Sequence, residues 1–123
     1  MAKNISNESE PSVIEEIKSV LAVLEEKKGE AIRVLDLRGK SSITDYVVLV
    51  TAISEPHAKA LKASLDSLIR EKGIAIIGND NDADSGWLVL DAFNYMVHIQ
   101  TERMRAFYGL EDLWIEGEEL DFS

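Results

Sequence analysis

The feature that most constrains this chain is a continuous apolar run, Val47 to Val50, followed within a few residues by an amphipathic segment. A strand with one face in water alternates apolar and polar residues, whereas an unbroken apolar run is typical of a strand with protein on both faces. We therefore predict that the strand Asp45 to Thr51 lies in the interior of a sheet.

A helix is predicted directly after this strand. Ser54 can cap the first turn, where a proline such as Pro56 is tolerated, and Gly73 is expected to end the helix. Spacings of three and four define one apolar and one charged stripe: Ala58, Leu61, Leu65 and Leu68 on the first, and Lys62, Asp66 and Arg70 on the second. A buried strand followed by a one-faced helix predicts an α/β or α+β layer structure.

The remaining elements complete a single domain. A first helix is predicted from a capping box, Ser12 with Glu15, to Gly29, and a last one from Thr101 to Gly109. Further strands are predicted at residues 31–37, 74–77, 87–91 and 95–99. The fold expected is a mixed five-stranded sheet with helices packed on it, between a flexible tail at 1–12 and a loose acidic tail at 115–123.

Composition excludes several classes of function. The chain has no cysteine, so disulfides, thiolate nucleophiles and cysteine-based metal sites are excluded. No apolar run approaches the roughly 18 residues of a membrane span, and no targeting segment is visible, which predicts a cytoplasmic protein. The net charge of −10, from 13 Lys+Arg and 23 Asp+Glu, disfavours direct nucleic-acid binding and favours a basic protein partner, although acidity also serves solubility alone.

An aspartate-rich loop is the one candidate metal site. Asp80, Asp82 and Asp84 alternate as calcium ligands do, but Ser85 stands where an EF-hand loop needs glycine, and strands are predicted on both sides. A solvated turn is the favoured interpretation. The sequence also lacks a P-loop, a dinucleotide fingerprint and a nucleophile elbow, so no metal, cofactor or catalytic residue is predicted.

The hairpin at residues 87–99 carries the most informative side chains. A turn on two residues, either Ala92-Phe93 or Phe93-Asn94, divides its side chains between two faces, and a three-residue turn would regroup them. The two sets are Trp87, Val89, Asp91, Met96 and His98, and Leu88, Leu90, Val97 and Ile99. The second set suits a buried side. The first is either covered by Trp114 and its neighbours, which the pattern alone favours, or left bare as a docking surface with an aromatic anchor.

Four ordered segments closely resemble the ribosomal silencing factor family, also called RsfS or Iojap-like. They are Val34 to Tyr46, Trp87 to Asp91, Val97 to Ile99 and Arg105 to Trp114, and the resemblance spans residues 13–114. It implies a nucleotidyltransferase-type fold that has lost its active site. The chain departs from the family in the hairpin turn, where Phe93 and Asn94 stand in place of a glycine and an acidic residue. That departure leaves the turn type in doubt.

The resemblance implies a non-enzymatic regulator of translation. Such a protein binds the large ribosomal subunit through ribosomal protein L fourteen and keeps the small subunit from joining, with a possible further part in large-subunit maturation. The docking residues expected here are Trp87, Val89, Asp91, Met96 and His98, with Asp91 pairing with a basic side chain. A homodimer through the same face is a further expectation. Two alternatives stay open: an active nucleotidyltransferase-like enzyme, and a cytosolic adaptor for some other basic protein.

Overall fold

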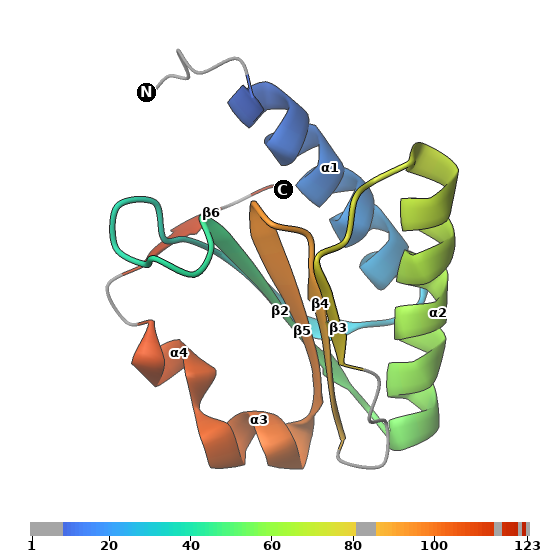
Figure 1. Cartoon of the computed structure of the whole chain (residues 1–123). Helices are drawn as coiled ribbons and strands as arrows, with labels where there is room; N and C mark the ends of the chain where they lie inside the picture. The colour runs from blue at the N-terminus through green and yellow to red at the C-terminus, as the bar shows by residue number, and fades with distance from the viewer. Residues whose placement is uncertain (1–8, 81–85, 115–116, 121, 123) are drawn as a thin grey trace.

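A mixed six-stranded sheet organises the chain in this computed structural model, which describes residues 9–80, 86–114, 117–120 and 122 (Figure 1). The strands are β1 (Glu30–Asp36), β2 (Tyr46–Ala52), β3 (Gly78–Asp80), β4 (Trp87–Asp91), β5 (Tyr95–Thr101) and β6 (Glu118–Leu120). Their order across the sheet is β3-β4-β5-β2-β1-β6. β2 and β5 run parallel, and every other neighbouring pair is antiparallel.

The predicted central strand is confirmed. β2 lies between β5 and β1, and all seven of its residues are buried. Its side chains therefore reach both faces of the sheet, as the unbroken apolar run indicated. Val48 and Val50 belong to the core on one face, while Val47 and Leu49 belong to a smaller cluster on the other.

Two long helices cover one face of the sheet, and two short ones lie over part of the other (Figure 1). The long helices are α1 (Ser9–Glu26) and α2 (Glu55–Lys72), and the short ones are α3 (Glu102–Tyr108) and α4 (Leu110–Leu113). α2 has the predicted ends, because the Ser54 side chain accepts the His57 N–H and Gly73 is left-handed. α1 begins at Ser9, before the predicted Ser12 cap. Of the helices described, none is long and apolar enough to span a membrane.

Two predictions about strands were wrong. Ile74 to Ile77 form no strand, since Ile74 and Ile76 pack against the core without pairing and β3 begins at Gly78. Their β-branched side chains signalled burial instead of strand pairing. The tail predicted to be loose contributes β6, which pairs with β1. The prediction followed the acidic composition of this tail and overlooked Leu120, which packs against the core. The sheet therefore has six strands, where five were predicted.

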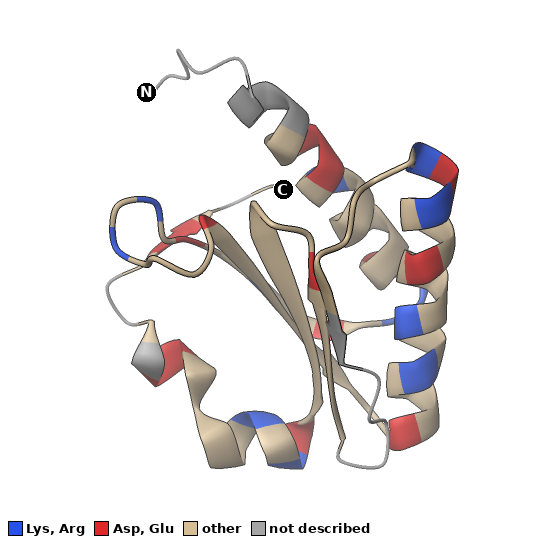
Figure 2. Ribbon diagram, in the orientation of Figure 1, with Lys and Arg blue, Asp and Glu red and all other residues tan. Residues whose placement is uncertain are grey.

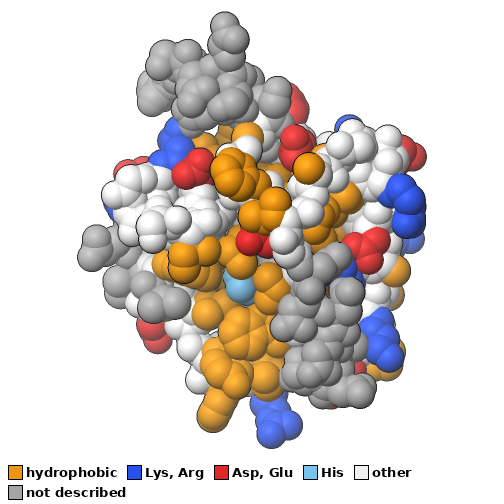
Figure 3. All heavy atoms as spheres, viewed as in Figure 1, with side chains coloured by type: hydrophobic (Ala, Val, Ile, Leu, Met, Phe, Trp, Pro, Cys, Tyr) orange, Lys and Arg blue, Asp and Glu red, His pale blue; other side chains and the backbone are white. Residues whose placement is uncertain are grey.

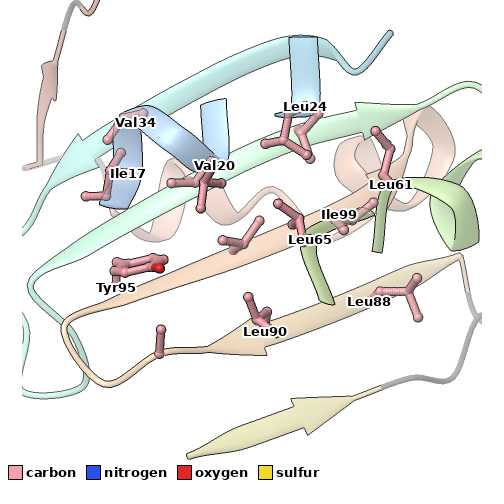
Figure 4. Packing of buried hydrophobic residues seen from close by; sticks show 14 of the residues in the cluster. Ile17, Val20, Leu24, Val34, Leu61, Leu65, Leu88, Leu90, Tyr95 and Ile99 are labelled. Carbon is pink, nitrogen blue, oxygen red and sulfur yellow. The ribbon is translucent and has the colours of Figure 1, made fainter. Parts of the chain in front are cut away.

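The main core fills the space between the sheet and the two long helices (Figure 4). Its labelled side chains come from α1, α2 and the strands: Ile17, Val20, Leu24, Leu61, Leu65, Val34, Leu88, Leu90, Tyr95 and Ile99. Lys62 departs from its prediction, because it lies on the charged stripe of α2 and yet is only 4% exposed. Its stem is buried while its Nζ reaches the Asp66 carboxylate at 2.9 Å, which keeps the charge paired.

Candidate functional site

The β4–β5 hairpin decides which side chains share a face. The Ala92 N–H donates to the Tyr95 carbonyl at 2.9 Å, which closes the turn on Phe93 and Asn94. This is one of the two predicted two-residue turns, and it confirms the predicted division of side chains. We call the face opposite α1 and α2 the open face; its hairpin residues are Trp87, Val89, Asp91, Met96 and His98.

The open face is covered at one end and accessible at the other, so each of the two alternatives left by the sequence holds for part of it. The Tyr108 ring lies over Trp87 with centroids 4.7 Å apart, and the Trp114 ring lies 5.7 Å from that of His98. Beyond this cover, Val89, Asp91 and Met96 are partly exposed. Figure 3 shows hydrophobic side chains gathered on this face around a histidine. The fold thus brings all five predicted residues together.

His98 lies beneath this surface as a neutral ring. Its exposure is only 5%, and the Trp87 indole N–H donates to its Nδ1 at 3.1 Å. An accepting Nδ1 places the proton of the neutral ring on Nε2, for which the described residues provide no hydrogen-bond partner. Burial lowers the pKa of His98 to about 4, against a smaller opposing effect of the Asp91 charge. His98 therefore orients Trp87 and carries no charge at neutral pH.

An arginine attaches α3 and α4 to the sheet. One amino group of Arg105 donates to the Ala31 carbonyl at 2.7 Å and to the Thr51 hydroxyl at 2.8 Å, and the other lies 2.9 Å from Glu111. Arg33 on β1 holds the same Glu111 carboxylate at 3.0 Å. The hydrogen bond from Arg105, with a further one from Arg33, lowers the pKa of Glu111. Sequence reasoning missed this network, because its members are far apart in the chain and share no spacing.

Side chains of the kind that bind metal ions are not clustered among the residues that the structure describes. In that part of the chain, no group of three His, Asp or Glu side chains is placed to hold a metal ion. The solvated loop was predicted to begin at Asn79, but Asn79 and Asp80 belong to β3, where Asp80 pairs with Val89. The rest of that loop, at 81–85, lies outside the described residues.

Comparisons with known proteins agree with this architecture. Residues 10–123 match the family model described as "Ribosomal silencing factor during starvation". The chain is 32% identical over 98 residues to ribosomal silencing factor RsfS of Haemophilus influenzae, covering 80% of this chain and 96% of that protein. Protein Iojap of Zea mays, a chloroplast protein, is 29% identical over 96 residues, covering 78% of this chain and 42% of that protein. A crystal structure of a Chromobacterium violaceum protein superposes with a TM-score of 0.79 at 29% identity, covering 90% and 92% of the two chains.

Proposed function

Because the chain belongs to the family of ribosomal silencing factors, we propose that it represses translation by binding ribosomal protein L fourteen on the large subunit and so excluding the small subunit. The mechanism needs bulk at a shared surface and makes or breaks no covalent bond. The observation that carries the proposal is the open face, where apolar and aromatic side chains surround a carboxylate on an acidic protein.

Charge favours a protein target over the RNA around it. The net charge of −10 repels phosphate backbones, while a basic ribosomal protein attracts an acidic partner. Figure 2 shows charged residues along α1, α2 and the loop between β1 and β2, whereas β4 and β5 carry few. A surface with few charges at its centre is typical of the buried part of an interface.

The open face offers distinct roles to its residues. Val89 and Met96 supply a partly exposed apolar centre, and Asp91 supplies a carboxylate at its edge. Trp87 forms the aromatic side of the surface and is positioned by His98 below it. Aromatic residues in such positions often dominate binding, each being worth roughly 2 kcal/mol or more on truncation.

Sedimentation with purified ribosomal subunits tests the proposal. The native protein should travel with free large subunits on a sucrose gradient and should reduce the amount of assembled ribosomes when small subunits are added. A double variant with Trp87→Ala and Asp91→Lys should lose both effects. Glu71→Lys, a charge reversal on the exposed side of α2, is the matched control and should keep both.

A finer variant separates charge from structure at Asp91. Its Oδ1 accepts the Phe93 N–H at 3.0 Å, so Asp91→Lys removes a hydrogen bond of the turn together with the charge. Asp91→Asn keeps an acceptor oxygen and removes only the charge. Weaker subunit binding by Asp91→Asn, with a larger loss at low ionic strength, would indicate pairing with a basic side chain.

Other outcomes would overturn the proposal. Native protein that fails to co-sediment with large subunits contradicts it directly. Metal-dependent turnover of a nucleotide would favour the nucleotidyltransferase-like alternative.

The homodimer expected from the sequence would use the same open face. Added large subunits should therefore convert any dimer to subunit-bound monomer, which light scattering would measure.

A further inference from the structure

The hairpin turn places a bulky residue in a backbone conformation that such residues avoid. Phe93 has φ 70°, and the Asn94 N–H donates to the Ala92 carbonyl at 2.8 Å. This is the geometry of a γ-turn with a positive central φ, which is strained and rare. Glycine or asparagine adopts positive φ with little cost, whereas an aromatic residue there is an outlier.

Packing within the chain does not explain the choice of phenylalanine. The side chain of Phe93 is 66% exposed, so it gains little from burial. The strain is imposed by the turn and by the hydrogen bond from the Phe93 N–H to Asp91. A strained residue with an exposed apolar side chain points to a role outside the fold.

Phe93 also lies next to the acidic group of the open face. Asp91 Oδ1 accepts the Phe93 N–H, and the described residues make no further hydrogen bond to that carboxylate. Ile77, which is 63% exposed, lies at the same end, because its N–H donates to the Asp91 carbonyl at 2.9 Å. Figure 3 shows apolar side chains continuing along this face on both sides of an acidic side chain.

We propose that Phe93 and Asp91 together form the binding position for a lysine or arginine side chain of the ribosomal protein partner. The carboxylate pairs with the cationic head, while the exposed ring covers the apolar stem and contacts the cation. This inference rests on the proposed function and adds a residue that determines its specificity. The strained turn holds the ring of Phe93 beside the Asp91 carboxylate, where both can take part in the contact.

Two substitutions separate strain from contact. Phe93→Asn relieves the strain of the positive φ, so we expect the temperature midpoint of unfolding to rise by about 2–5 °C. It also removes the ring, so we expect the dissociation constant for large subunits to rise about tenfold. Phe93→Leu keeps an apolar side chain and the strain, so we expect an unchanged midpoint and a dissociation constant only about threefold higher. Ile53→Asn is the control, because Ile53 is 70% exposed after β2, at the opposite end of the sheet, and should leave binding unchanged.

The outcomes distinguish this inference from the proposed function. If native protein binds large subunits and Phe93→Asn binds equally well, the inference is overturned and the proposed function stands. If Phe93→Asn fails to raise the unfolding midpoint, the strain premise is wrong and the inference is overturned in that case too. If native protein does not bind large subunits, both are overturned.

Discussion

The two faces of the sheet are built differently. One is closed by α1 and α2, each of 18 residues, over side chains such as Leu61, Leu65 and Leu90 that are 0% exposed. The other is covered by α3 and α4, of seven and four residues, over a smaller apolar cluster. The long helices are held by apolar burial, whereas the short ones combine one buried side chain, Leu110, with the ion pairs and hydrogen bonds of Arg105.

This difference indicates which face is available for binding. A helix too short to bury a continuous apolar stripe leaves part of the sheet uncovered. Regions with few buried apolar contacts are also the first to unfold locally. On the open face the partly exposed Asp91 carboxylate lies among apolar side chains, with the buried His98 beneath them. Stability should depend mainly on the closed face and partner binding on the open one. Four predictions test this separation.

The largest expected effect is on the closed face. Leu65→Ala removes a fully buried side chain and should lower the free energy of unfolding by about 3 kcal/mol, measured by urea denaturation. The comparison is Val89→Ala on the open face, which is already partly exposed and should cost about 1 kcal/mol or less. Folded Leu65→Ala should bind large subunits normally and Val89→Ala weakly; the reverse pattern would refute the separation.

The second effect concerns the attachment of α3 and α4. Arg105→Met keeps the stem but removes the hydrogen bonds to β1, β2 and Glu111, and should cost about 2 kcal/mol, since Arg33 remains to pair with Glu111. Tryptophan fluorescence should change as well, because Trp114 is part of this cover and Trp87 lies beneath it. Arg70→Met, on the exposed surface of α2, is the control and should change neither signal.

The third effect is a pH dependence that arises from the open face. His98 has a folded pKa of about 4, below the roughly 6.5 of an unfolded chain, so between these values only the unfolded state takes up the proton. Stability should therefore fall as the pH drops below about 6.5, by about 1.6 kcal/mol between pH 6.5 and 5. His98→Gln should lack this slope in denaturation curves measured at each pH. Equal slopes in the two proteins would show that His98 is not buried as a neutral ring.

The smallest effect belongs to α2. Asp66→Asn leaves the buried Lys62 ammonium without a charged partner and should cost about 1 kcal/mol. Native-like binding to large subunits is expected, since both residues lie on the helix that covers the closed face. A measurable loss of binding would extend the docking surface to that side of the molecule.

The sequence by itself determined the elements whose pattern is local. The apolar run of β2, the stripes and caps of α2 and the alternation along β4 and β5 follow from the 2.0 and 3.6 residue periods, which neighbouring residues alone define. The ordered family motifs added the relationship to ribosomal silencing factors, which the comparisons confirmed. They left open which of two two-residue turns, or a three-residue turn, closed the hairpin, and whether its Trp87 side was covered.

Only the tertiary structure decided how that face is covered. Arg105 donates hydrogen bonds to Thr51 and Ala31, which lie 54 and 74 positions away in the chain, and β6 pairs with β1, the first strand in the sequence. Lys62 likewise has the sequence spacing of an exposed residue and is buried by its surroundings. Contacts between distant segments depend on where the whole chain places them, and no local period encodes that position.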